Sequence, residues 1–280
     1  MNTDAIMELA LEMAGLAEIP GDTAIYYPGE DIERVLFGID MESAEVLLAH
    51  TLGYDLVISH HPMGGEAILN FHLVLERHVQ QMITAGVPKV VAREAVDGLI
   101  YERRILNSMR NYDHAPSVAR LLEMPYMNIH TPLDEIGRMR MAKTASQLNE
   151  QNAVHDLITL FQSSFGEFRN AQTNIEIMVG NPNNQVGQVV VSHGAGTNGG
   201  YPIAKAYFDH GVDTLVYIHC RPGDAQRLAQ EYAEKGKTLI VTGHIASDSL
   251  GINPFIEQLR AHGLQVTPIS GIIPPGSSHN

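Results

Sequence analysis

The chain has 280 residues, 44% of them hydrophobic, so it is long enough to bury a large core without disulfides or a structural zinc. Its formal net charge is −14, and so acidic a surface repels a nucleic-acid backbone, so we predict no nucleic-acid partner. Because Cys220 is the only cysteine, no intrachain disulfide can form. No run approaches the ~18 apolar residues that a membrane span needs, so we predict a cytoplasmic protein with no membrane partner.

The first half of the chain is predicted to alternate between helices and strands. Apolar positions spaced at three and four predict a helix over residues 5–17. Apolar runs at 34–40 and 55–59 flank a helical pattern at 42–52, and strand, helix, strand is the signature of a parallel sheet. Further helical patterns and one strand-like run follow, with helices at about 69–85, 92–112 and 115–123, a strand at 126–130 and a second helical block at roughly 135–164.

The second half repeats this alternation. The expected strands are 188–192, 214–218, 238–241 and 265–269, and the expected helices lie near 199–210, 224–235 and 253–262. The whole chain is therefore predicted to have an α/β fold with largely parallel sheets. No Pro/Gly/Ser-rich linker interrupts it, and a boundary near residue 140 divides it into an N-terminal part, 1–140, and a C-terminal part, 141–280.

Polar side chains that follow buried strands are the first candidates for a site, because ligands of open α/β sheets bind beyond the carboxyl ends of the strands. His60 and His61 come directly after the run 55–59, where both imidazoles can turn toward a metal centre. An isolated His-His pair is more often a structural hydrogen-bonding pair, but the position after a buried strand favours metal binding. Asp134 follows the next strand, and its carboxylate can either bridge two cations or cap a helix.

The C-terminal part supplies a further pair of candidate ligands. His244 and Asp248 follow the run 238–241. If a helix begins around Ala246, the two side chains lie four residues apart and fall on one side of the chain, as two ligands of one site should. The alternative is that Asp248 caps this helix.

A glycine-rich turn covers residues 192–200 between an expected strand and an expected helix. Backbone N–H groups of such a turn can approach an anion, and the dipole of the following helix adds to the attraction. A lone Gly-X-Gly pattern also fits a plain tight turn. The candidate substrate-binding residues in this part of the chain are His193, Gly194 and Gly196, together with His219, which also follows a strand.

Five segments, taken in chain order, resemble the Nif-three-like family, also known as GTP cyclohydrolase type-two-like or dinuclear metal-centre hexameric proteins. The strongest are the apolar strand followed by His-His-Pro at 55–62 and the His-Thr-X-X-Asp block at 130–134. The other three are Gly-Ile-Asp at 38–40, Ser-His-Gly-Ala-Gly at 192–196 and Thr-Gly-His-Ile-Ala-Ser-Asp at 242–248. The resemblance covers nearly the whole chain, from about 32 to 269.

This resemblance implies two interlinked α/β lobes with a metal cleft between them, two divalent ions and a homo-hexamer. His60 and His61 match the paired metal histidines of the family, Asp134 matches its bridging aspartate and His244 its late histidine. Asp248 stands where the family usually has glutamate, and the shorter side chain reaches about 1.5 Å less far. A second departure lies at 217–220, Tyr-Ile-His-Cys, where the family commonly has Thr-Gly followed by an acidic residue.

A set of imidazoles and carboxylates without thiolates suits zinc, manganese, iron, nickel or magnesium. The leading interpretation is a metal-dependent hydrolase that acts on a nucleotide-like or phosphorylated small molecule. The alternative is a metal-dependent regulatory or scaffold protein without turnover. A dinucleotide-binding enzyme is a third interpretation, which the glycine spacing at 194–200 fits less well. No residue outside the metal set stands out as a general base.

Overall fold

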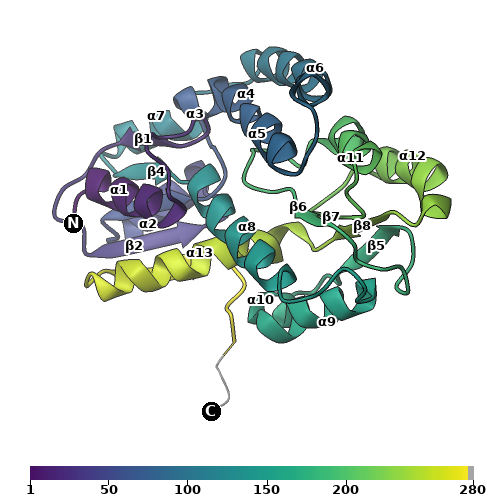
Figure 1. Ribbon diagram of the computed structural model, residues 1–280. Helices are drawn as coiled ribbons and strands as arrows, with labels where there is room; N and C mark the ends of the chain where they lie inside the picture. Colours follow the sequence, from purple (N-terminus) through teal and green to yellow (C-terminus); the bar gives the residue numbers. More distant parts are fainter. Residues whose placement is uncertain (277–280) are drawn as a thin grey trace. The chain divides into compact units, whose positions relative to one another are not determined.

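A computed structural model describes residues 1–276 of the chain (Figure 1). By its internal contacts the chain forms two compact units, each assembled from separate segments. Unit 1 comprises Met1–Val74, Tyr101–Ile136 and Gly251–Ile272, and unit 2 comprises Leu75–Ile100, Gly137–Leu250 and 273–276. Three helices continue from one unit into the other: α6 (Lys89–Ser108), α8 (Thr131–Ala145) and α13 (His244–Ala261). The division at residue 140 stays a sequence prediction.

Unit 1 is built on a five-stranded sheet in the order β1-β4-β3-β2-β9. Strand β2 (Arg34–Gly38) runs parallel to β3 (Leu56–Ser59) on one side and to β9 (Gln265–Ile269) on the other. β3 in turn runs parallel to β4 (Tyr126–Asn128), and β1 (Ala24–Tyr27) adds an antiparallel edge. The carboxyl ends of β2, β3 and β4 therefore meet at one edge of this sheet.

The sheet of unit 1 is buried on both faces. Successive residues of a strand point to opposite faces, and Val35 and Phe37 belong to one hydrophobic cluster whereas Leu36 belongs to another. Such burial explains why the strands are continuous apolar runs rather than alternating ones. The helices of this unit, apart from those shared with unit 2, are α1 (Thr3–Ala14), α2 (Ser43–Leu52), α3 (Gly65–Leu69), α4 (Phe71–Val74) and α7 (His114–Leu121).

Unit 2 has a four-stranded sheet in the order β5-β8-β7-β6. β6 (Val189–Val191), β7 (Thr214–Tyr217) and β8 (Thr238–Val241) are parallel, and β5 (Glu176–Val179) pairs antiparallel with β8. Its core includes Leu157, Phe161 and Ile240. The helices of this unit are α5 (Glu76–Thr84), α9 (Val154–Ser164), α10 (Gly166–Asn170), α11 (Gly200–Asp209), α12 (Pro222–Tyr232) and the 3-10 turn η1 (Ala233–Lys235).

These two mostly parallel sheets confirm the predicted α/β class. The helical block expected at 135–164 is two helices, α8 and α9, because the segment between them forms side-chain turns: the Asn149 amide donates to Asn152 Oδ1 at 2.9 Å, and the Gln151 amide donates to Asn149 Oδ1 at 3.0 Å. Such local bonds compete with the helix. The antiparallel edge strands β1 and β5 were not predicted.

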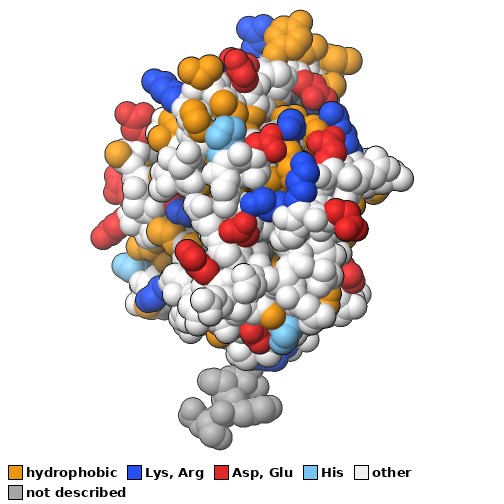
Figure 2. All heavy atoms as spheres, turned by 45° about the vertical axis from the view of Figure 1, so that its right-hand side comes forward, with side chains coloured by type: hydrophobic (Ala, Val, Ile, Leu, Met, Phe, Trp, Pro, Cys, Tyr) orange, Lys and Arg blue, Asp and Glu red, His pale blue; other side chains and the backbone are white. Residues whose placement is uncertain are grey.

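The surface combines charged side chains of both signs with a group of exposed apolar residues. On the face drawn in Figure 2, acidic and basic side chains are interspersed, and hydrophobic side chains gather at its top, over α6. Among the described helices, none is long and apolar enough to cross a membrane. The exposed apolar residues along and just after α6 are Val90, Tyr101, Ile105, Leu106, Met109 and Tyr112.

Candidate metal centre

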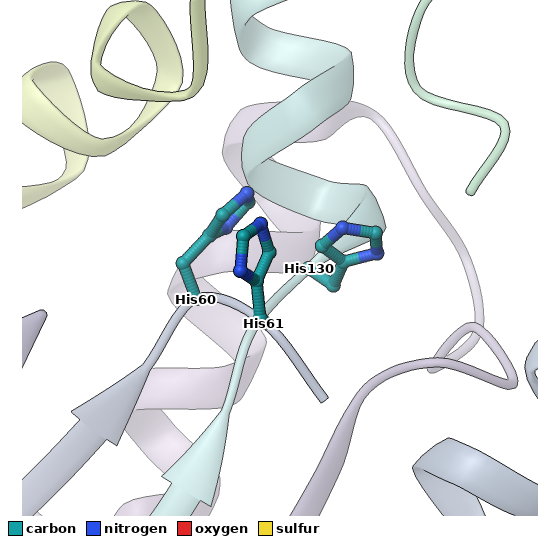
Figure 3. Close-up of side chains that lie close together, drawn as sticks. All are labelled: His60, His61 and His130. Carbon is teal, nitrogen blue, oxygen red and sulfur yellow. The ribbon is translucent and has the colours of Figure 1, made fainter. Parts of the chain in front are cut away.

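Three imidazoles gather beyond the ends of two neighbouring strands of unit 1. His60 and His61 directly follow β3, and His130 lies two residues beyond β4 (Figure 3). Their ring centroids are 4.9 to 5.7 Å apart, and each offers a ring nitrogen within 4.8 Å of the other two. Parallel pairing of β3 and β4 brings these strand ends together, so the convergence follows directly from the topology of the sheet.

Main-chain hydrogen bonds fix the first two histidines beyond the strand. The amide of His60 donates to the Gly38 carbonyl at 2.9 Å, and the amide of His61 donates to the Ile39 carbonyl at 2.9 Å. The Ser59 hydroxyl bonds to the His61 carbonyl at 2.9 Å. Hydrogen bonds therefore hold the backbone beyond the end of β3, where the two histidine side chains no longer follow the alternation of a strand.

Each of the three rings directs Nδ1 at an oxygen acceptor. His60 Nδ1 lies 3.0 Å from the Ile129 carbonyl oxygen, and His61 Nδ1 lies 2.7 Å from Asp40 Oδ1. His130 Nδ1 lies 2.6 Å from Asp22 Oδ2. Because a carbonyl or carboxylate oxygen only accepts, Nδ1 is the donor in each ring. Nε2 is then the nitrogen with which each ring can bind a cation, an arrangement typical of metal-binding histidines.

Asp22 is a fully buried carboxylate that fixes the orientation of His130. Besides the bond from His130, Asp22 Oδ2 accepts from the Thr131 hydroxyl at 2.7 Å. Asn128 anchors this part of the chain, since its side-chain nitrogen donates to the Asp22 carbonyl at 2.7 Å and its oxygen accepts from the Ala24 amide at 3.1 Å. A buried charge is stable only when it is paired and hydrogen-bonded, and Asp22 meets both conditions.

Asp134, in the first turn of α8, completes the group from the opposite side of the rings. One of its carboxylate oxygens lies 3.2 Å from His60 Nε2, and the other lies 3.7 Å from His130 Nε2. Burial lowers the pKa of His130, but the negative charges of Asp134 and Asp22 outweigh burial and raise the pKa above its usual value. The carboxylates therefore make this corner of the fold attractive to positive charge.

The donor set of unit 1 fits a divalent metal ion. It presents three imidazole nitrogens and a carboxylate, and two further carboxylates, Asp22 and Asp40, orient two of the rings. His60, Asp22 and Asp134 are almost completely excluded from solvent, so the ligands are held in place before any ion arrives. Nitrogen and oxygen ligands of this kind are those that zinc, iron and nickel prefer.

A second group of candidate ligands lies in unit 2, beyond β8. Helix α13 begins at His244, so Asp248 lies one turn further along, and His244 Nε2 is 3.3 Å from Asp248 Oδ2. The Asp248 side chain is 1% exposed and that of His244 is 41% exposed. The His219 ring, beyond β7, packs edge-on against that of His244 with centroids 4.7 Å apart. The late pair predicted from the sequence is thus formed within one helix.

The glycine-rich turn of unit 2 runs from Ser192 to the start of α11. Gly194, Gly196, Gly199 and Gly200 all adopt positive φ angles, a conformation that favours glycine. α5 supports the turn from one side, because Arg77 Nε donates to the Gly194 carbonyl and Gln81 Nε2 to the His193 carbonyl, both at 2.6 Å.

On the far side of the turn, Asn198 connects it to the end of β7. Its side-chain oxygen accepts from the Ile218 amide at 2.8 Å, and its nitrogen lies 3.3 Å from the His219 ring. His193 is buried and His219 is exposed. The turn is therefore a structured loop held by side chains on both sides, as a binding loop requires.

The predicted ligands thus fall into two groups: His60, His61 and Asp134 come together in unit 1, and His244 and Asp248 in unit 2. That all five bind one pair of ions stays a prediction. His130 belongs to the motif at 130–134 but was not predicted to be a ligand. The spacing of His130 and Asp134, four residues, is the same as that of His244 and Asp248 and could have identified it. Asp22 had no sequence signal.

Comparison with known proteins gives one close match and several distant ones among solved structures. The structure of a NIF3 superfamily protein from Sphaerobacter thermophilus is 47% identical, with 97% of this chain and 98% of that chain covered and a TM-score of 0.92. Reduced HcgD from Methanocaldococcus jannaschii is 15% identical, with 96% and 97% covered and a TM-score of 0.57. The hypothetical protein SA1388 from Staphylococcus aureus is 15% identical, with 100% and 99% covered and a TM-score of 0.52.

The two distant matches show a shared fold alone. No family model matches the chain, and no curated protein does either.

Proposed function

The chain belongs to the NIF3 superfamily, and from that premise we propose that it binds two divalent metal ions and hydrolyses a nucleotide-like or phosphorylated small molecule. A cyclohydrolase reaction on a nucleotide such as GTP is one form of this proposal. The observation that carries it is the convergence of His60, His61 and His130, whose ring nitrogens lie within 4.8 Å of one another. The Asp134 carboxylate lies 3.2 Å from His60 Nε2, and a cluster of imidazoles with a buried carboxylate favours a divalent cation.

In this proposal His60, His61 and Asp134 hold the metal ions in unit 1, and His130 presents a third imidazole to the same group. Divalent ions bound there supply a Lewis acid that polarises an electrophile and activates water at neutral pH. Asp22 and Asp40 keep two of the rings in the tautomer that presents Nε2. The buried position of the ligands limits competing water and strengthens every electrostatic contact.

We propose that His244 and Asp248 of unit 2 are metal ligands as well. The four-residue spacing and the 3.3 Å contact support this role, as does the near-complete burial of the Asp248 carboxylate, which favours a cationic partner. The glycine-rich turn is proposed to hold the anionic end of the substrate through its backbone N–H groups at the start of α11. The residues assigned to that task are His193, Gly194, Gly196 and His219.

The metal is proposed to be zinc, manganese, iron, nickel or magnesium. Three imidazoles in unit 1 favour zinc, iron and nickel, because magnesium prefers an all-oxygen shell. The number of ions, two, follows from the family's dinuclear character and is part of the proposal.

The experiment is to load the protein with each divalent metal in turn and to measure hydrolysis of phosphoesters, GTP and small amides. His61→Ala is the test variant, and His50→Ala, which removes an exposed imidazole from α2, is the matched control. Turnover that is lost in the first and kept in the second supports the hydrolase. Metal binding without any turnover favours the regulatory or scaffold alternative, and a protein that binds no divalent metal contradicts both.

We also propose that the chain forms a homo-hexamer. The exposed apolar side chains along and just after α6 support self-association: Val90 is 68% exposed, Tyr101 63% and Met109 75%, and exposed apolar side chains that gather on one element can mark an interaction site. Light scattering after size-exclusion chromatography measures the assembly directly. A mass close to 30.7 kDa, that of one chain, contradicts this proposal.

A further inference from the structure

A cavity of about 370 Å³ opens in unit 1 beside His61. Its lining includes His61 and Asp40, which bond to each other at 2.7 Å. The lining also includes Arg110 and Asn111, from the connection between α6 and α7, and His114, the first residue of α7. The cavity thus joins one of the candidate metal ligands to a group of side chains that the metal centre does not use.

The side chains of Arg110, Asn111 and His114 all carry hydrogen-bond donors. Within residues 1–276 the guanidinium of Arg110 makes no ion pair. The Asn111 side-chain oxygen accepts from the Asp113 amide at 3.1 Å, which leaves the amide nitrogen as a donor. His114 adds an imidazole, which offers an N–H in either protonation state. Three side chains of the lining therefore supply N–H groups for an acceptor-rich ligand.

The acidic side chains of the cavity are already engaged within the protein. Asp40 accepts from His61, and the Glu42 side chain takes part in the capping box at the start of α2. Among the lining residues Arg110 is the one with a permanent positive charge, so attraction of an anion is strongest beside it. An anionic group is therefore expected to approach the lining at Arg110 rather than at Asp40 or Glu42.

We propose that this cavity binds a small-molecule phosphate ester, with the phosphoryl group held by Arg110, Asn111 and His114 and the rest of the molecule directed toward His61. This inference deepens the proposed function and rests on it, because it names the class of substrate for the same metal centre. It places a phosphoryl-binding group in unit 1, in addition to the glycine-rich turn of unit 2.

Two properties of the cavity select this class of ligand. Its volume lies near the lower end of the roughly 300–1,000 Å³ typical of ligand pockets, which suits a small metabolite and excludes a polymer. Arg presents a two-pronged donor that matches phosphate. Arg110, Asn111 and His114 are three separate donor side chains, which the three terminal oxygens of a phosphoryl group match better than the two oxygens of a carboxylate.

The test is calorimetric titration of the metal-loaded protein with phenylphosphonate, which cannot be hydrolysed, and with benzoate, its carboxylate counterpart. The variants are Arg110→Gln and Arg104→Gln. Arg104 lies on α6 outside the cavity, over the ring of Tyr101, so its removal changes the net charge equally. We expect Arg110→Gln to weaken phenylphosphonate binding about tenfold or more, and Arg104→Gln to change it less than about twofold. Benzoate is expected to bind more weakly than phenylphosphonate.

Elemental analysis of the same samples separates this inference from the proposed function. Metal content is expected to be the same in both variants and the unaltered protein, since neither arginine belongs to the metal-binding group. Loss of phosphonate affinity in Arg110→Gln at unchanged metal content supports the inference. Equal affinities in the two variants overturn it even if metal is bound, and so does benzoate binding as tight as phenylphosphonate binding. Absence of metal from every sample contradicts the proposed function instead.

Discussion

Two buried imidazoles, His130 in unit 1 and His78 in unit 2, have opposite electrostatic surroundings. Burial lowers the pKa of both, and for His78 it brings the pKa down from 6.5 to about 4, with the charge of Arg77 acting in the same direction. For His130 the carboxylates of Asp134 and Asp22 reverse the effect of burial and raise the pKa. The difference lies entirely in the neighbours, since both rings are removed from solvent.

The charged groups around a buried histidine distinguish a histidine of the candidate site from a histidine of the core. His78 sits on α5, where the backbone of Thr197 acts to raise its pKa but does not outweigh burial, and its neutral form suits the core. His130 is oriented by one carboxylate and faces another, so its surroundings favour positive charge at the ring. A metal ion can provide that charge.

The largest expected effect is on stability, from removing the carboxylate that orients His130. Asp22→Ala is expected to lower the free energy of unfolding by about 3–5 kcal/mol, because it leaves the partners of a buried charge without their acceptor. Asp22→Asn keeps the shape and is expected to lose less. Urea unfolding of the metal-free protein measures both. A loss below about 1 kcal/mol for Asp22→Ala, the value of a surface pair, would show that the buried pairing is unimportant.

The second prediction concerns His78 and pH. Between pH 6.5 and about 4 the unfolded chain binds a proton at this ring that the folded protein does not. The free energy of unfolding therefore falls as pH falls through this window, by roughly 1.4 kcal/mol per unit and about 3 kcal/mol in all. In His78→Gln that contribution to the slope is expected to vanish. An exposed control, His50→Gln, should keep the slope, and equal slopes in all three proteins refute the assignment.

The third prediction tests the exposed counterpart of the Asp22–His130 pair. Asp40 is 63% exposed and bonds to His61, so Asp40→Ala is expected to leave the free energy of unfolding within about 0.5 kcal/mol of its original value. It is expected to weaken divalent-metal affinity about tenfold or more, the usual effect of removing an orienting carboxylate. Competition with a chromophoric chelator measures the affinity. The control is Asp97→Ala, which removes an exposed carboxylate from α6. Equal metal affinities in the two variants contradict the role of Asp40.

The smallest expected effect on stability is at the second group of ligands. His244 is 41% exposed, so His244→Ala is expected to change the free energy of unfolding by less than about 0.5 kcal/mol. If it binds metal as proposed, metal content nevertheless falls, which elemental analysis detects. Unchanged metal content in this folded variant removes His244 from the metal set.

The sequence was sufficient for the parallel sheets and for the position of His60 and His61 directly after a buried strand, because buried strands are read from apolar runs and the residues after them are adjacent in the chain. The position of His130 beside Asp134 could also be predicted, from their four-residue spacing on a helix. Asp22 could not. It lies in a short turn before β1, and its place depends on a hydrogen bond to Asn128, 106 residues away.

Long-range contacts of this kind leave no local pattern. The same reason explains the missed edge strands β1 and β5, since each is short and takes its partner from a distant segment. The cavity beside His61 likewise depends on residues 110–114, which follow a helix and carry no strand-end signal. Local periodicity therefore predicts which candidate ligands follow the strands, whereas tertiary contacts determine which side chains orient these ligands.

The most direct test of the metal centre is a crystal structure of the protein loaded with zinc, with anomalous scattering recorded at the zinc edge. We expect an anomalous peak in unit 1 at about 2.0–2.1 Å from Nε2 of His60 or His61, with Nδ1 of each ring still bonded to its oxygen acceptor. A peak bonded to Nδ1, or zinc bound only at other residues while His60, His61 and His130 keep water as their neighbour, would contradict it.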